Sequence, residues 1–229
     1  MGIVDVFFNA DVLRQALPLL LTGLWTTLLL GVASIALGML LGLALVMLRL
    51  YAARPLRLLA VAYISLFRAL PLLVLLVLIY YALPFLGVRL SSFAAATAAL
   101  SLVSGAYTAE IFRAGIEAVP RGQFEASAAL GLRRWRTLAR VVLPQALRIV
   151  VPPLTNNSIN VLKDTALASV VAMPDLLKQA TQAQALYANP SPLVGAAALY
   201  LLVLLPMVAL VGVLARRSAA PVGRAPAKA

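Results

Sequence analysis

Polar side chains that could bind a charged solute occur inside one of the apolar stretches of this sequence. Asn157, Asn160 and Asp164 lie three and four residues apart, a spacing that places them on one face of a helix. Ionisable groups inside a membrane are expensive, so they line pathways or pair with one another. We therefore predict that these residues line a translocation path. The alternative is that they satisfy backbone groups freed by Pro152 and Pro153, or pair with one another near the outer surface.

Two further ionisable residues, Arg68 and Glu110, lie near the ends of apolar stretches. We expect an ion pair between them that is structural, with a gating role as the alternative. We expect neither a catalytic residue nor a metal site. The sequence has no histidine and no cysteine, which excludes disulfides and Cys/His metal sites, and its seven acidic residues are widely scattered.

The composition indicates that these residues belong to a membrane protein. Of the 229 residues, 63% are hydrophobic and 11% are charged, with a mean hydropathy of +1.01. Soluble domains are only about half apolar. The net charge of +12 does not indicate a nucleic-acid partner, because the basic residues separate apolar runs instead of covering a solvated face with interleaved aromatics. We expect contact with membrane lipid and no nucleic acid.

Apolar runs of about 20 residues, the length that crosses a bilayer, predict an all-α membrane protein with about five transmembrane helices. We place the spans near residues 19–48, 69–86, 91–110, 146–173 and 193–215, all within one domain over 19–215. Residues 1–18 are expected to form an external, interfacial segment, and residues 216–229 a cytoplasmic tail. Arg68 and Pro71 divide the second apolar stretch into an amphipathic approach and a span.

Small residues predict which helices approach each other closely. Gly38 and Gly42 form a G-x-x-x-G pattern in the first span, and the third span is built largely from Ala, Ser, Thr and Gly. Such residues let helix backbones come close inside a bundle. We interpret the pattern as packing within one chain, with a dimer interface as the alternative.

The basic residues predict the orientation of the chain, because cytoplasmic loops carry an excess of Lys and Arg. Most of the basic residues that lie outside the spans fall in the first loop, in the polar insertion over 110–144 and in the tail. We therefore expect the N-terminus outside and the C-terminus in the cytoplasm. The polar insertion is then cytosolic.

The cytosolic insertion contains residues that typically begin and end a short helix. Pro120 suits its start, Gly131 suits its end, and Phe124, Ala128 and Leu132 share one face. A second helix is expected over 133–143, ending at Pro144. The small residues of the first helix allow close approach by a partner protein. The alternative is a basic loop that binds anionic lipid head groups.

The insertion resembles a known motif. Its stretch EASAALGLRRWRTLARVVLP is similar to the EAA motif in the permease subunits of bacterial ABC importers, with Glu125, Ala126 and Gly131 on the pattern and Ser127 in place of the second alanine. Two other stretches, FRALPLLV and LKDTALASVVAMPDLL, resemble the polar amino acid uptake branch, which includes histidine, glutamine and arginine permeases. Ala69 and Leu70 depart from the Gly-Thr of that branch.

The resemblance implies a type I importer fold with a cytosolic coupling helix, in a multi-pass subunit of the bacterial inner membrane. Its implied partners are a second permease, identical or related, two cytosolic ATPase subunits, and an external solute-binding protein. The residues that would contact the ATPase are Gln123, Phe124, Glu125, Ala126, Ser127, Ala128 and Gly131. ATP and Mg²⁺ would bind the ATPase, since this chain has no phosphate-binding loop and is expected to need no cofactor of its own.

The expected function is therefore non-catalytic: translocation of amino acids, driven by separate ATPase subunits. A strip of amide and carboxylate groups could satisfy both the ammonium and the carboxylate of an amino acid. An amino-acid-like solute such as an opine, or another small polar compound, is the nearest alternative. A channel or scaffold that works without ATP, and a small intramembrane enzyme, are alternatives from other classes.

Overall fold

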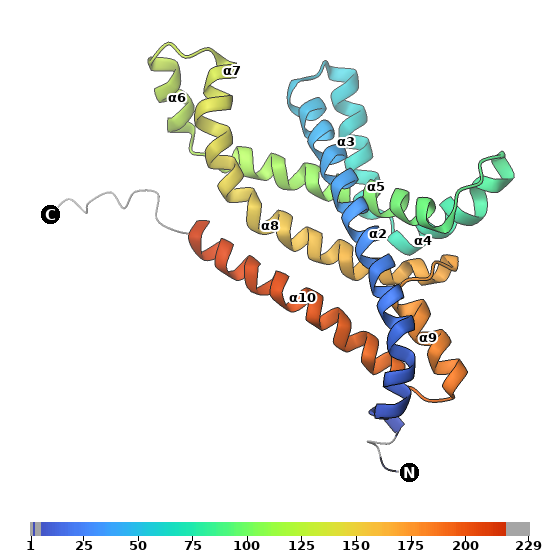
Figure 1. The fold of residues 1–229 in the computed structure, drawn as a ribbon. Coiled ribbons are helices and arrows are strands. Elements are labelled where there is room, and N and C mark those ends of the chain that lie inside the picture. The colour runs from blue at the N-terminus through green and yellow to red at the C-terminus, as the bar shows by residue number, and fades with distance from the viewer. Residues whose placement is uncertain (1, 3–5, 219–229) are drawn as a thin grey trace.

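The computed structural model describes residue 2 and residues 6–218, and within them it contains helices and no strands (Figure 1). Four helical runs are long and apolar enough to cross a membrane, and a bent pair makes a fifth candidate. This confirms the expected all-α architecture with about five spans. The α-helices are α2 Ala10–Tyr51, α3 Arg54–Ala69, α4 Leu72–Val77, α5 Ser92–Glu117, α6 Arg121–Ala129, α7 Arg134–Thr137, α8 Leu143–Asp164, α9 Leu176–Tyr187 and α10 Ser191–Ser218.

Helix α2 is longer than the predicted first span. Its 42 residues extend for about 63 Å, roughly twice the thickness of the hydrocarbon core. Asn9 caps its first turn, because the Asn9 Oδ1 accepts the backbone N–H groups of Asp11 and Val12, both at 3.1 Å. The second half of the expected interfacial segment, from Ala10 onward, is thus continuous with the first span. The predicted tail, apart from the end of α10, lies outside the described residues.

Helices α2 and α5 pack through small residues. A Cβ atom added to Gly42 would lie 2.5 Å from the Cβ of Thr108, and one added to Gly38 would lie 2.8 Å from the Ser104 Oγ. On α5 the buried residues are mostly Ala, Ser, Thr and Gly. The G-x-x-x-G pattern therefore serves packing within the chain, as expected.

The second span is broken where the sequence predicted a division. Helix α3 ends at Ala69, and the chain bends by 102° before Leu72–Leu86. Leu70 is extended, with a ψ of 127°, because the ring of Pro71 disfavours a helical conformation in the preceding residue. A π-helical turn over Leu78–Ala82 and a 3-10 turn over Leu83–Leu86 complete an arm that extends away from the bundle (Figure 1).

The second helix of the insertion does not stop at Pro144, and this prediction is wrong. The backbone continues from α7 through a π-helical turn over Leu138–Val142 into α8, and the Leu143 N–H donates to the carbonyl of Leu138. In the wider turn each backbone N–H donates to the carbonyl five residues earlier instead of four. Pro144 then lies in the first turn of α8, where its missing N–H costs little. Helix α8 also continues through Pro152 and Pro153.

The end of α8 leads into the last two helices. A 3-10 helix over Thr165–Val171 is followed by Asp175, which caps α9 by accepting the Lys178 N–H at 3.0 Å. The Leu176 N–H donates to the Thr27 Oγ1 at 2.9 Å, which fixes α9 against α2. Asp175 is fully buried, and this desolvation raises the pKa of its carboxyl group to about 6. Helix α10 packs against α2, α8 and α9.

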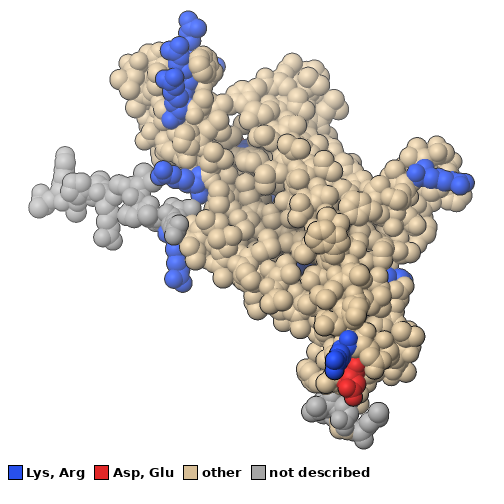
Figure 2. All heavy atoms as spheres, in the orientation of Figure 1, with Lys and Arg blue, Asp and Glu red and all other residues tan. Residues whose placement is uncertain are grey.

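The basic residues are unevenly distributed over the surface. On the face drawn in Figure 2, much of the Lys and Arg lies over the end that carries α6 and α7 and around the end of α10, with smaller patches on the arm and beside the start of α2. This arrangement fits the orientation predicted from the sequence, in which α6 lies in the cytosol. The orientation itself stays a prediction.

We expect the substitution Gly42→Ala to destabilise the bundle by about 1–3 kcal/mol, because its methyl group overlaps Thr108 and lies 2.9 Å from the Gly105 carbonyl oxygen. Thermal unfolding of the detergent-solubilised protein measures this. The matched control is Gly212→Ala in α10, where an added Cβ has no atom within 4 Å. Equal melting temperatures for the two variants would contradict the packing argument.

The orientation can be measured directly because the chain has no native cysteine. A cysteine at the exposed position Ala129 in α6 should react with an impermeant maleimide only after the cells are permeabilised. A cysteine at the exposed position Thr181 in α9 should react in intact spheroplasts. The reverse labelling pattern would overturn the predicted orientation.

Candidate functional site

Helix α6 is a short helix with a well-defined end. The extended residue Pro120 precedes Arg121, and the helix ends at Ala129, two residues before Gly131, whose φ is +67°. The Leu132 N–H donates to the Ser127 carbonyl at 3.0 Å and the Gly131 N–H to the Ala128 carbonyl at 2.9 Å. This pair of bonds is the Schellman motif, which favours glycine at the left-handed position. The predicted start and stop of this helix are confirmed.

The outer face of α6 combines apolar side chains with one basic residue, Arg121, and one acidic residue, Glu125. The side chains of Phe124, Glu125, Ala126 and Ala128 are exposed, and Leu130, just beyond the helix, is 78% exposed. Such a face is small enough to enter a groove on another protein. Ser127 differs, because it is 3% exposed and its Oγ donates to the Gln123 carbonyl at 2.7 Å. Its side chain therefore faces this chain instead of a partner, which corrects its predicted place in the contact set.

Gln123 also faces inward, where it joins α6 to α8. The Gln145 Nε2 donates to the Gln123 Oε1 at 3.3 Å and to the Val141 carbonyl at 2.9 Å. The exposed residues Phe124 and Ala128 also line a groove, together with Leu132 and with Tyr51 at the end of α2. A side-chain hydrogen bond thus joins α6 to the base of α8, whereas a groove lies between α6 and the end of α2, so a force on α6 reaches α8.

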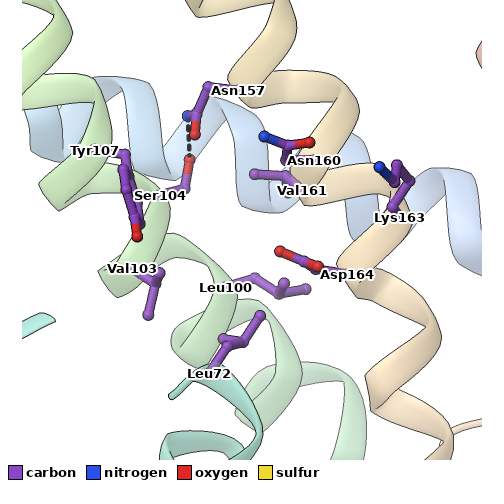
Figure 3. Close-up of a pocket in the computed structure, with 10 residues that line it drawn as sticks. All are labelled: Leu72, Leu100, Val103, Ser104, Tyr107, Asn157, Asn160, Val161, Lys163 and Asp164. Atoms are coloured by element: carbon purple, nitrogen blue, oxygen red, sulfur yellow. Dashed lines mark hydrogen bonds between the residues drawn. The ribbon is translucent and has the colours of Figure 1, made fainter. Parts of the chain in front are cut away.

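A cavity of about 280 Å³ opens between α4, α5 and α8 (Figure 3). All three predicted pathway residues line it. Asn157 is held in place by its Nδ2, which donates to the Ser104 Oγ at 3.2 Å and to the Thr108 Oγ1 at 3.3 Å. In Figure 3 the side chains of Asn160 and Asp164 point toward the cavity. The remaining lining residues are Leu72, Leu100, Val103, Ser104, Tyr107, Val161 and Lys163.

The cavity combines groups that suit a small zwitterion. The Asp164 carboxylate and amide oxygens can accept from an ammonium group, while Lys163 and the amide nitrogens can donate to a carboxylate. Its volume lies just below the range of ligand pockets for drug-sized molecules, which is about 300–1,000 Å³. The arrangement therefore suits a solute of amino acid size.

The expected ion pair between Arg68 and Glu110 does not form, and this prediction is wrong. Glu110 pairs instead with Arg49 of α2, with a distance of 2.7 Å from Oε2 to Nη1, and with Arg113 one turn along α5. Arg68 lies beside Tyr107, with its guanidinium carbon 5.5 Å from the ring centroid. Arg68 thus lies beside a residue that precedes Glu110 by three positions on α5, and not beside Glu110 itself.

The sequence analysis left Tyr107 and Lys163 out of the candidate site, although both line the cavity. Two sequence signals could have found them. Tyr107 follows Ser104 at i+3 on a helix of small residues, and Lys163 follows Asn160 at i+3. Each therefore shares a helical face with a residue of the cavity wall.

Comparison with known sequences places the chain among transport proteins. Residues 34–219 match a family described as the binding-protein-dependent transport system inner membrane component. The chain is 42% identical over 173 residues to the L-cystine transport system permease protein TcyB of Bacillus subtilis, covering 75% of this chain and 74% of that one. It is 36% identical over 204 residues to the arginine transport system permease protein ArtQ of the same organism, covering 88% and 92%.

Comparison with solved structures supports the same assignment. A crystal structure of an amino acid ABC transporter with histidines contains a chain that is 36% identical, with a TM-score of 0.85 over 90% of this chain and 96% of that chain. A chain of the inward-facing MetNI methionine ABC transporter shares the fold, with a TM-score of 0.73 over 87% and 96% and an identity of 23%. The protein belongs to the family of binding-protein-dependent transport system inner membrane components.

Proposed function

We propose that this chain is a permease subunit of an ATP-driven importer of amino acids. The observation that carries the substrate class is the polar cavity between α5 and α8, which has groups for both an ammonium and a carboxylate. Relatives named for cystine and arginine transport, and a solved amino acid transporter of similar fold, support it. The subunit itself is non-catalytic, and a partner hydrolyses ATP.

Helix α6 is the contact with the ATPase in this proposal. Its exposed face carries Phe124, Glu125, Ala126 and Ala128, while Gln123 and Ser127 support the helix from inside. When the ATPase subunits close on ATP, they displace α6. The Gln123–Gln145 contact then transfers this displacement to α8. ATP binding thus biases the bundle between two arrangements.

Asn157, Asn160 and Asp164 line the translocation path in this proposal. These polar residues lie on a helix that is apolar enough to span the membrane, so their exposed groups need a water-filled path or a partner. A second permease, identical or related, completes the path, and an external binding protein delivers the solute. The chain lies in the bacterial cytoplasmic membrane with α6 in the cytosol.

The substitution Glu125→Lys should reduce substrate-stimulated ATP hydrolysis at least tenfold, because it reverses the charge at the proposed ATPase contact. The measurement uses the complete importer, reconstituted in liposomes with its ATPase and binding protein. The control is Glu117→Lys, the same charge change at an exposed position outside α6, where loss of a surface ion pair with Arg113 costs about 1 kcal/mol or less. Full stimulation in the Glu125→Lys importer would refute the proposed contact.

The substitution Asp164→Ala should reduce amino acid uptake at least tenfold, because it removes the carboxylate that accepts the ammonium group. Uptake is measured in the same liposomes, and assembly is verified by gel filtration of the complex. The control is Asn156→Ala, because Asn156 is exposed on the same helix and does not line the cavity. Normal assembly with undiminished uptake in Asp164→Ala would rule out the path.

A further inference from the structure

Polar groups that the proposed mechanism does not use are buried where four helical segments meet. Helices α2, α9 and α10 pack against one another, and the 3-10 helix Thr165–Val171 packs against α2 and α9. Figure 1 shows α9 and the start of α10 beside the same end of α2. The polar groups of this junction, which we call the buried polar cluster, belong to Thr27, Thr165, Asp175, Gln179 and Tyr200.

The carboxyl group of Asp175 is the acid of this cluster, and only half of it is used. Its Oδ1 accepts the Lys178 N–H at 3.0 Å, whereas its buried Oδ2 has no hydrogen-bond partner among the described residues. An ionised carboxylate can only accept hydrogen bonds, and a bare oxygen of this kind is costly in a buried site. The geometry therefore favours the neutral acid, in agreement with the pKa of about 6 that burial gives Asp175.

Two neighbouring groups of the cluster also lack partners. The Gln179 Oε1 and the Tyr200 hydroxyl oxygen are buried, and neither has a hydrogen-bond partner in the part of the chain that the structure describes. Gln179 follows Asp175 by four residues, so the two share a face of α9. A Cβ atom added to Gly23 of α2 would lie 2.8 Å from the Gln179 Cγ and 3.0 Å from the Asp175 carbonyl oxygen. A proton on Asp175 would thus add a donor to a cluster that has unpaired acceptors.

Few charges act on this carboxyl group. Lys178, on α9 itself, is the one charged side chain among the described residues that lowers the pKa of Asp175 by its charge. Tyr200 of α10 is the titratable group that faces Asp175 from another element. Helix α2 and the 3-10 helix contribute the uncharged hydroxyl groups of Thr27 and Thr165, which lie next to Tyr200. The protonated cluster is therefore neutral, whereas the ionised one has little to offset its charge.

We propose that Asp175 is a proton-binding site that acts as a pH-sensitive lock on the junction of α2, α9, α10 and the 3-10 helix. With the proton bound, the cluster stays dry and α9 stays packed against α2 and α10. When the proton leaves, the carboxylate draws water into the junction and loosens it. The 3-10 helix directly follows Asp164, so the lock acts on the end of α8. It does not depend on which solute the chain carries.

Thermal unfolding of the detergent-solubilised, full-length chain tests the lock, with Asp175→Asn as the variant that mimics the protonated acid and keeps the helix cap. The folded-state pKa of Asp175 lies above the unfolded value of about 3.9, so its stabilisation is present at low pH and is lost as the pH rises through about 6. Between about pH 5 and about pH 7.5, the melting temperature of the wild type should therefore fall by roughly 3 °C or more relative to that of Asp175→Asn.

The control variant is Asp11→Asn, the same change at an exposed acid in the first turn of α2, which should follow the wild type at both pH values. If Asp175→Asn fails to fold, Asp175→Ser takes its place, because serine also caps helices and has no carboxyl group. The same pH dependence in the wild type and in the folded Asp175 variant overturns the lock.

Infrared difference spectra between the two pH values give a direct measurement of the proton. When the pH is raised, the wild type should lose a protonated-carboxyl band that the spectrum of the Asp175 variant lacks. Identical difference spectra would show that Asp175 releases no proton in this range, and would overturn the proposal. Neither measurement involves transport, so failure of the lock leaves the proposed importer function untouched.

Discussion

The close approach of α2 and α5 is the constraint on which the rest of the structure depends. Lipid tails are as apolar as leucine, so close packing of small residues, and not hydrophobic burial, holds such helices together. Two residues of α5, Ser104 and Thr108, contact both α2 and α8. Ser104 and Thr108 receive the glycine face of α2, and their hydroxyl groups accept from Asn157 of α8. A larger residue in this seam would therefore displace the wall of the cavity as well.

The second organising element is the helical run from α7 to the end of the 3-10 turn after α8. It spans Arg134–Val171, with Gln145 near one end, against α6, and Asp164 near the other, at the cavity. One element thus connects the surface that is offered to a partner with the polar groups at membrane depth. The unbroken helical backbone between Gln145 and Asp164 links these two regions directly.

Local features of the fold could be predicted from sequence, whereas contacts between helices could not. Gly131 and Pro71 act through their own backbone preferences, so the end of α6 and the break before α4 followed from residue type. The prediction of an Arg68–Glu110 ion pair was wrong because an ion pair requires both residues to lie at the same depth in the bundle. Hydropathy determines the depth of a residue only to within a helical turn. Ser127 was misplaced and Tyr107 was missed for a related reason, since the rotation of each helix about its axis is set by its neighbours.

Two adjacent prolines in α8 have a mechanical consequence. Pro152 and Pro153 have no N–H, so the two carbonyl groups four residues earlier receive no helical hydrogen bond from these positions. They lie between the base of α8 and the cavity residues, where the helix consequently has its lowest bending stiffness. A force on the base of α8 would therefore bend the helix at the prolines more readily than shift the whole helix along its axis. The two prolines therefore form a hinge within α8.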